Sequence, residues 1–538
     1  MTFTKRIFLF LAIVLTSHTY AQTISMDQLP MEDALRRLQL MGKIEGDISF
    51  MLRPIQSTRL HSWDSVLQSI DPSVKAMGNK KIDKHFFGKW GYASLLPVQI
   101  TQQYVTAQPF QELDGPMIAS SGYQVMASAG IFAKLGPLTI QLQPQYVSAA
   151  NSDFRGTKQT PNYQQTHWGN SSIRLNAGPV SVGISTENIT WGPSLMNPLL
   201  MSAHAPGFFH YTINSRRPLR TPIGSFEWQW LAGYLNGAEE SLRPIIDYPY
   251  AANPVRRYFN AAMIAYKPKW LSGLSIGVTR TVQELETLLN DNKQWDLLFR
   301  NISRLSDKQE FVNSLLYSVE DNRDQYGAIF IRWVILKEQA EFYGEWGRND
   351  AFFNLRDFIQ DPEHSRGYTF GLRKLFNKNK SNKYWQFNSE YTTNEQPSSY
   401  PVRSAGSWYG HAAVFPGYTN YGDFLGAPMG QSASSLFFNL SKYNGWNKIG
   451  FQFERNTHNA EIYDLYKDYT KPNLTKWVDF GLRLYYDRPY KNLYISSTFA
   501  IKRSFNYKWS QPADATGIGF NNPNDLNSFL FKFIFRYL

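Results

Sequence analysis

The chain has 538 residues and a formal net charge of +12, with 43% hydrophobic residues, 16% aromatic residues and no cysteine. The lack of cysteine excludes disulfides, thiolate metal sites, cysteine nucleophiles and an acylated cysteine that would anchor a lipoprotein. The positive charge is not gathered in a long run, so it favours an acidic glycan or a lipopolysaccharide phosphate as the counter-charge over nucleic acid.

The first 21 residues have the pattern of a secretory signal peptide. Lys5 and Arg6 form a basic start, and residues 7–15 form an apolar stretch that is too short to span a bilayer as a helix. The small-residue site Thr19-Tyr20-Ala21 predicts cleavage before Gln22. After this segment, no stretch approaches the ~20 consecutive apolar residues that a transmembrane helix needs.

Residues 22–94 are predicted to form a small helical segment. Leu35, Leu38 and Met41 make an apolar stripe at helical spacing over residues 31–42, and Gly42 is a suitable residue to end the helix. A second short helix is expected within 62–77. The segment is too small to build a large core, so we expect a plug or periplasmic segment packed against the next domain. A free-standing N-terminal domain is the alternative.

From residue 95 onward, apolar and polar residues alternate with a period of two, as in strands with one face in lipid and one in water. Leu138, Ile140 and Leu142, for example, alternate with polar residues. In the last strand, the residues predicted to face lipid are Phe529, Phe531, Phe533, Phe535 and Tyr537, and those predicted to face the lumen are Lys532 and Arg536.

Because bacterial barrels have even strand numbers, the sequence predicts an all-β transmembrane barrel of about 16–18 antiparallel strands over residues 95–538. The predicted location is the outer membrane. The long polar stretches that we expect to be extracellular loops are 151–169, 189–223, 283–324, 347–365, 394–431 and 505–525. Part of 283–324 has helical periodicity and is expected to hold a loop helix.

The sequence gives no support for catalysis. It has no Gly-x-Ser-x-Gly motif and no His-x-x-x-His pair, so we predict no catalytic residues, no metal site, no cofactor and no enzyme activity. Several acidic residues are expected to face the lumen as paired wall charges, although an acid–base pair is the alternative. These are Glu187, Glu227, Glu341, Glu345, Glu390 and Glu454, with Arg174, Lys532 and Arg536 as basic neighbours.

The most distinctive stretch is the loop at 189–223, which contains Trp191-Gly192-Pro193, Asn197-Pro198-Leu199-Leu200 and Ala205-Pro206-Gly207-Phe208. Its prolines and apolar residues predict an ordered loop that folds inward. Together with the signal, the helical segment and the aromatic C-terminus, this loop resembles the Wzi family of capsule-assembly outer-membrane proteins. The resemblance implies an eighteen-stranded barrel, plugged by N-terminal helices and by an inward loop, that acts as a lectin for capsular polysaccharide.

A glycan site is expected to combine aromatic faces with arginines that capture acidic groups. The predicted loop at 189–223 offers Trp191, His210, Tyr211, Arg216, Arg217 and Arg220 as candidates. The alternative is that its aromatic residues pack into the lumen and its arginines pair with Glu187 and Glu227. Trp408 and Tyr409, in a second aromatic stretch that also holds His411, Phe415, Tyr418, Tyr421 and Phe424, are further candidates. An interfacial aromatic girdle is the alternative there.

The predicted function is binding of a surface polysaccharide, which helps to attach or assemble capsule or exopolysaccharide. The predicted partners are that polysaccharide, the lipid and lipopolysaccharide of the outer membrane, and other envelope proteins, but not nucleic acid. Two alternatives remain: a substrate-selective porin, and an accessory barrel subunit of an outer-membrane secretion or assembly complex.

Overall fold

The computed structural model describes residues 23–24, 29–44, 47–56, 81–86, 91–152, 162–237, 255–288, 323–349, 355–376, 382–400, 403, 405–411, 414, 416–461, 476–509 and 524–537. Three predicted features lie wholly or mostly outside these residues: the signal peptide, the second helix within 62–77 and the loop helix within 283–324.

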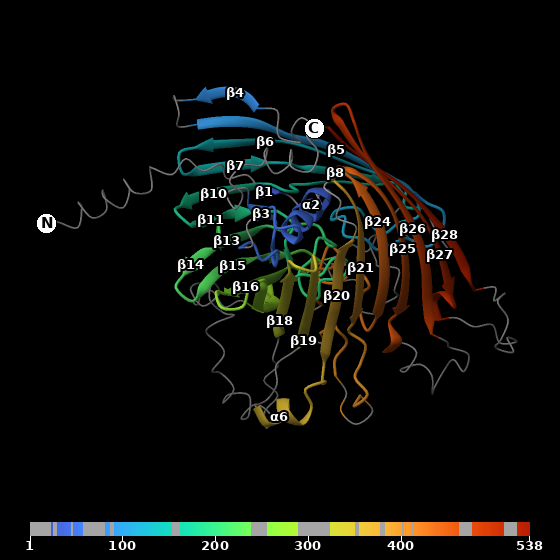
Figure 1. Ribbon diagram of the computed structural model, residues 1–538. Helices are drawn as coiled ribbons and strands as arrows, with labels where there is room; N and C mark the ends of the chain where they lie inside the picture. The colour runs from blue at the N-terminus through green and yellow to red at the C-terminus, as the bar shows by residue number, and fades with distance from the viewer. Residues whose placement is uncertain are drawn as a thin grey trace, which may run out of the picture.

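An antiparallel β-barrel of 18 strands encloses the lumen (Figure 1). In chain order its strands are β5 (Gly91–Val105), β6 (Gly122–Leu135), β7 (Leu138–Leu142) with β8 (Gln145–Ala149), β9 (Tyr163–His167) with β10 (Ser172–Ala177), β11 (Val180–Ser185), β13 (His210–Ser215) with β14 (Leu219–Thr221), β15 (Gly224–Leu235), β16 (Arg257–Pro268), β17 (Leu274–Leu285), β18 (Arg323–Ile335), β19 (Ala340–Asn349), β20 (Arg366–Phe376), β21 (Lys383–Thr393), β24 (Ser434–Asn444), β25 (Asn447–His458), β26 (Trp477–Tyr490), β27 (Leu493–Phe505) and β28 (Leu526–Tyr537). The last strand pairs with the first, with Tyr537 opposite Val98 and Leu530 opposite Val105, so the barrel is closed.

The remaining described elements are short. They are β1 (Thr23–Ile24), α2 (Leu29–Leu40), β2 (Leu52–Arg53), β3 (Ile55–Gln56), β4 (Lys81–Phe86), β12 (Thr190–Trp191), η4 (Glu286–Leu288), α6 (Leu355–Gln360), β22 (Thr419–Asn420), β23 (Asp423–Phe424) and η6 (Tyr507–Trp509). In the described part of the chain, no helix is both long and apolar enough to cross a membrane. Helix α2 starts two residues before the predicted one, and Gly42, at a positive φ of 68°, ends its C-terminal turn as predicted.

The outer face of the barrel is apolar. In β28, Phe531, Phe533 and Tyr537 are 42%, 44% and 43% exposed, whereas Lys532 and Arg536 are buried in the lumen, as the alternation predicted. Tight turns such as Gly136-Pro137 join the strands at one end, and long loops join them at the other. In outer-membrane barrels the short turns are periplasmic and the long loops extracellular, which orients this one.

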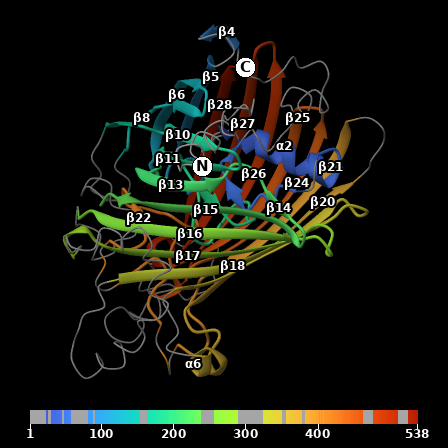
Figure 2. The ribbon, with the colours of Figure 1, turned by 90° about the vertical axis from the view of Figure 1, so that its left-hand side faces the viewer.

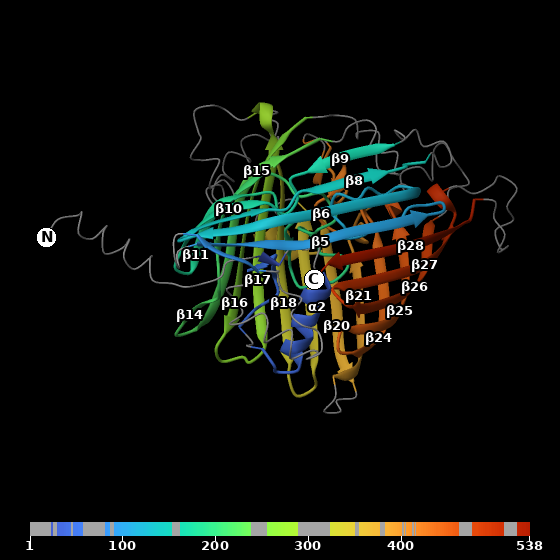
Figure 3. The same cartoon turned by 90° about the horizontal axis from the view of Figure 1, so that it is seen from above.

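The lumen is occupied by segments from both ends. Helix α2 lies inside the barrel, and the strands surround it in two perpendicular views (Figures 2 and 3). Leu35 and Leu38 pack there against Trp446 and Tyr494, which belong to the periplasmic end of the wall. The loop between β11 and β13, residues 186–209, fills the extracellular half and is termed the inward loop.

The predicted loop boundary of 189–223 is wrong at its C-terminal end. Residues 210–215 and 219–221 are the wall strands β13 and β14, and β13 pairs with β11 on one side and β15 on the other. These strands are short, and Pro218 and Pro222 flank the second one. Because the two strands are short and flanked by prolines, their period-two alternation is too brief to be recognised in the sequence. The prediction therefore includes β13 and β14 in the loop.

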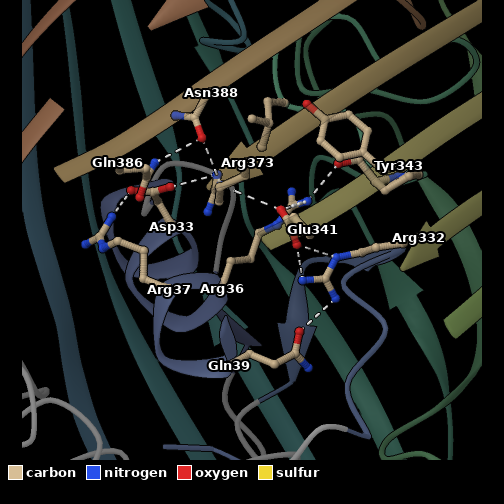
Figure 4. Close-up of polar contacts among 12 residues, drawn as sticks. Asp33, Arg36, Arg37, Gln39, Arg332, Glu341, Tyr343, Arg373, Gln386 and Asn388 are labelled. Carbon is tan, nitrogen blue, oxygen red and sulfur yellow. Dashed lines mark hydrogen bonds and ion pairs between the residues drawn. The ribbon is translucent and has the colours of Figure 1, made fainter. Parts of the chain in front are cut away.

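A network of buried ion pairs joins α2 to the wall (Figure 4). Glu341 of β19 accepts from Arg36 of α2 at 2.8 Å and from the Nε of Arg332 of β18 at 2.8 Å. The guanidinium of Arg373 on β20 lies 3.6 Å from the same carboxylate. All four side chains are at most 2% exposed, so this contact is made without water around it.

Asp33, one helical turn before Arg37, extends the network. It pairs with Arg37 and, at 2.9 Å, with Arg373, and it accepts from the hydroxyl of Tyr443 at 3.1 Å. Burial raises the pKa of the Asp33 carboxyl, but the positive charges of Arg37 and Arg373 outweigh that effect and hold the pKa well below its usual range. Asp33 is therefore ionised in the lumen at neutral pH.

We expect an arginine at Phe533 to destabilise the barrel. Phe533 is the middle member of the five outward aromatic positions of β28, so a charge there would lie in the apolar band and cost about 2–4 kcal/mol of unfolding free energy. Ile534→Arg points the charge into the lumen and should cost much less. Urea titration of folding into vesicles measures both, and equal losses at the two positions would contradict the assigned faces.

Replacing Glu341 by alanine should weaken the attachment of the plug. Arg36, Arg332 and Arg373 would keep their buried positive charge without this counter-charge, a change that typically costs about 3–5 kcal/mol of unfolding free energy. Glu338→Ala is the control, because its pair with Lys374 is on an exposed turn and should contribute no measurable stability. If urea unfolding gave the same stability for both variants, the network would not be the anchor of the plug.

Candidate functional site

Two wall glutamates hold the inward loop by its backbone. Glu390 on β21 accepts the N–H groups of Leu195, Met196 and Asn197 at 2.7, 3.1 and 2.9 Å. Glu345 on β19 accepts those of Ser194 and Leu199 at 3.0 and 2.9 Å. Both carboxylates are buried, and backbone N–H groups are the partners that a buried carboxylate needs. The Asn197-Pro198-Leu199 stretch is therefore fixed across the lumen.

Gly192 explains the Trp-Gly-Pro part of the loop. Its φ is 95°, and a Cβ atom added there would lie 2.2 Å from Oε1 of Glu345. The backbone N–H of Gly192 donates to the carbonyl of Met51 at 2.9 Å, and Arg53 donates to the carbonyl of Gly192 at 2.7 Å. Glycine thus lets the inward loop approach both the wall and the N-terminal segment.

The extracellular loop at 394–433 packs on the outer side of the inward loop. The hydroxyl of Tyr409 donates to the carbonyl of Leu199 at 2.6 Å and accepts from the N–H of Ala427 at 2.9 Å. The backbone N–H of Ser202 donates to the carbonyl of Leu425 at 2.7 Å. Tyr409 and Trp408 lie in the same buried apolar cluster as Trp191. The two loops form one ordered layer across the lumen.

The predicted aromatic candidates do not meet at a common surface. Trp191 is fully buried and donates through its indole N–H to Gln229 at 3.0 Å, and His210 is fully buried beside Phe208. Trp408 and Tyr409 are buried as well, which corresponds to core packing and not to a girdle. Tyr211 is half exposed on the outer, lipid-facing side of β13. Phe415 lies outside the described residues.

The three predicted arginines are at the opposite end of the barrel. Arg216 directly follows β13 and donates to the carbonyl of Gly178, in a periplasmic turn, at 2.9 Å. Arg217 is exposed, and Arg220 pairs with Asp47 at 2.6 Å in solvent. The predicted association of these arginines with the extracellular loop is wrong because β13 and β14 carry the chain down the wall before it reaches them.

A cavity of about 90 Å³ lies between the loop layer and the inner face of β24 to β27. Such a volume holds roughly six water molecules. Most of its wall comes from the loop after β5, the inward loop, the 394–433 loop and the extracellular halves of these strands. The polar and aromatic side chains that line it include Gln111, Glu112, Asn197, Phe424, Glu454, Asn456, His458, Trp477, Asp479, Arg483 and Lys502.

The charged groups that line this cavity are paired with each other. Arg483 donates from Nε to Glu454 at 2.9 Å and also pairs with Glu112. Lys502 lies 3.5 Å from Asp479. Burial raises the pKa of Glu112, but the charges of Lys532 and Arg483 outweigh it and bring the pKa down to about 2. The loop after β5 is thereby tied to the wall by ionised groups.

Aromatic side chains form another part of the cavity. The ring of Trp477 stacks on that of His458 with centroids 4.0 Å apart, and its indole N–H donates to Asp479 at 2.8 Å. His458 contacts the other carboxylate oxygen of Asp479 at 2.8 Å through Nε2. These contacts, with those of Tyr507 and Trp509 on the same ring, bury the indole and hold it in a fixed orientation at the edge of the cavity.

Most of this cavity was not predicted from the sequence, although Glu454 and Lys532 were placed in the lumen. Glu187, Glu227, Glu341, Glu345 and Glu390 are buried there too, which confirms their predicted lumenal position. The predicted charge pairing is seen for Glu187 with Arg174 at 2.7 Å, whereas Glu345 and Glu390 accept backbone N–H groups of the inward loop. The missed residues Trp477, Asp479 and Arg483 share one face of β26. Their alternation with Val478 and Phe480 is the signal that could have identified them.

Asp423, beside the cavity residue Phe424, gives a pH-dependent prediction. Burial and the nearby Asp114 raise the pKa of Asp423 to about 8. The folded loop therefore keeps a proton that the unfolded chain releases near pH 4, and its stability should fall as the pH rises from 4 to 8. Asp423→Asn should flatten the difference in protease resistance of this loop between pH 6 and pH 9.

An exposed loop acid provides the control for that measurement. Glu363→Gln, near α6, should leave the pH difference as it is in the unaltered chain. An undiminished pH difference in Asp423→Asn would show that other groups cause it.

Among solved structures, one barrel is similar to this chain over nearly its whole length. It is Wzi from Escherichia coli, described as an outer-membrane protein involved in group 1 capsule assembly and a carbohydrate-binding β-barrel, which superposes with a TM-score of 0.64 at 12% identity. The match covers 96% of this chain and 99% of that one. OpdK, an outer-membrane protein of Pseudomonas aeruginosa, matches with a TM-score of 0.40 at 10% identity, over 83% of this chain and 98% of that one.

At the level of sequence alone, no curated protein matches the chain. A family model does match it, namely that of capsule assembly protein Wzi, over residues 104–513. The matched range runs from the end of β5 to beyond β27 and so includes the inward loop, the 394–433 loop and the cavity. The chain is a member of the capsule assembly protein Wzi family, built as an outer-membrane β-barrel.

Proposed function

We propose that this protein binds a surface polysaccharide at the extracellular end of its barrel and thereby helps to attach or assemble capsule or exopolysaccharide at the cell surface. Membership of the capsule-assembly family is the observation that carries the proposal. The Escherichia coli structure, described as carbohydrate-binding, supports it. The cavity beside Trp477 adds a place where aromatic and polar side chains meet.

In this proposal the protein retains its ligand and neither transports nor cleaves it. The lumen is crossed by two layers, since α2 is tied to the wall through Glu341 and the inward loop through Glu345 and Glu390. A strand of polysaccharide would therefore be held at the extracellular side. In this proposal lipid and lipopolysaccharide surround the aromatic outer face, and other envelope proteins contact the periplasmic turns.

The substrate-selective porin and the accessory subunit are tested against this proposal by two measurements. In planar bilayers, the proposal expects no steady large conductance from the full-length barrel, because α2 and the inward loop occupy the lumen. A steady large conductance would favour the porin. Purification from cells with envelope proteins but without any glycan would favour the accessory subunit.

Direct binding is the decisive test of the proposed function. The purified full-length barrel should bind polysaccharides on a glycan array. Cells that lack the protein should release more polysaccharide into the medium than cells that carry it. Failure to bind any glycan on the array, together with unchanged retention on cells, would refute the proposal.

A further inference from the structure

We infer that the cavity beside Trp477 accepts an uncharged sugar unit, not an acidic one; the inference rests on the proposed function and specifies the ligand class of its site. With a volume of about 90 Å³ the cavity does not hold a polymer strand, so we assign to it a single sugar unit of the polymer. Its lining is mixed, with carboxylates, amide groups and rings on the same surface. Three features of that lining decide between neutral and acidic ligands.

The first feature is the balance of charge. Three carboxylates line the cavity, those of Glu112, Glu454 and Asp479, with the two cations Arg483 and Lys502 and the imidazole of His458. Outside the lining, Lys532 pairs with both Glu112 and Asp114, so this neighbouring pair adds one charge of each sign and leaves the carboxylates in excess. Arg483 lies between Glu454 and Glu112, and Lys502 both pairs with Asp479 and donates to the carbonyl of Pro109 at 2.7 Å. A uronate that entered would meet three negative groups and two cations that are already engaged. Like charges in a partly dehydrated site repel strongly, so an acidic sugar is excluded.

The second feature is a set of uncharged polar groups. The side-chain amides of Gln111, Asn197 and Asn456 line the cavity. The Oε1 atom of Gln111 is buried, and a buried amide oxygen without a partner carries a desolvation cost. Amide groups both donate and accept, which matches the hydroxyl groups of a neutral sugar.

The third feature is rigidity. Asn197 is placed by the hydrogen bond of its backbone N–H to Glu390, and Trp477 by its contacts with His458 and Asp479. Asn197 and Asn456 come from the inward loop and from β25, so a sugar would bridge the loop layer and the wall. A pre-organised site of this kind loses little conformational freedom on binding, which favours selectivity for one ring shape.

The test uses the full-length barrel in detergent and saturation-transfer-difference NMR. The probes are glucose, galactose, mannose, rhamnose, fucose and N-acetylglucosamine as neutral sugars, with glucuronate and galacturonate as acidic ones. At least one neutral sugar should give a signal, and the two uronates should give none. Binding of the neutral sugar should be the same in 50 and 500 mM sodium chloride, because no charge on the ligand is screened.

Variants locate the binding. Asn197→Ala and Asn456→Ala should each lower the affinity for the neutral sugar by about 3–10-fold, the usual effect of losing one neutral hydrogen bond. Asn447→Ala, at the periplasmic start of β25, is the matched control and should have no effect. The triple variant Arg216→Gln, Arg217→Gln and Arg220→Gln should also bind normally, because those arginines are at the periplasmic end.

Two results would overturn the inference while the proposed function stands. One is binding of a uronate in preference to every neutral sugar. The other is polysaccharide binding on the array with no neutral-sugar signal, or with a signal that neither asparagine variant reduces. If the unaltered protein binds no glycan of any kind, the proposed function fails as well, and the array result separates that case from the other two.

Discussion

Glu341 is the contact on which the closed lumen depends. It touches α2 and the wall strands on both sides of its own strand at once, through Arg36, Arg332 and Arg373. A barrel of this strand number is wide enough to leave an aqueous channel, so its interior must be filled by something that the polar inner wall can bind. An apolar plug would leave those wall groups without partners. Charged residues on α2 pair with these wall groups instead. The ion pairs thereby fix the position of the helix in the lumen.

In the extracellular half of the lumen, carboxylates of the inner wall again bind the segments that fill it, but through different partners. Glu345 and Glu390 bind backbone N–H groups of the inward loop, and Glu454 binds a loop carboxylate indirectly, through Arg483. Acidic residues of the inner wall therefore act as attachment points at three levels of the lumen. The cavity lies where the wall of β24 to β27 meets the loop layer without filling all the space. In the proposed function, its position near the extracellular end would place an external ligand on a rigid base.

Regular patterns made part of the fold predictable from the sequence. Alternation assigned the lipid face of β28 and the lumenal position of its lysine and arginine, and an apolar stripe with Gly42 located α2 to within two residues. The cavity could not be located in this way, because its residues come from segments far apart whose contacts depend on strand register and loop path. The placement of Arg216, Arg217 and Arg220 failed for a related reason. Six residues, 210–215, were too few to stand out as a strand, yet that strand moves the arginines from one end of the barrel to the other.

The pairing of Arg36 with Glu341 also sets an order of events during assembly. The two residues are 305 positions apart, and Arg53 and Gly192 are 139 apart. Contacts between such distant positions form late, because the loop between them must first be closed. The ion pairs of α2 can form only when β18, β19 and β20 lie side by side, so filling of the lumen depends on that part of the wall being formed.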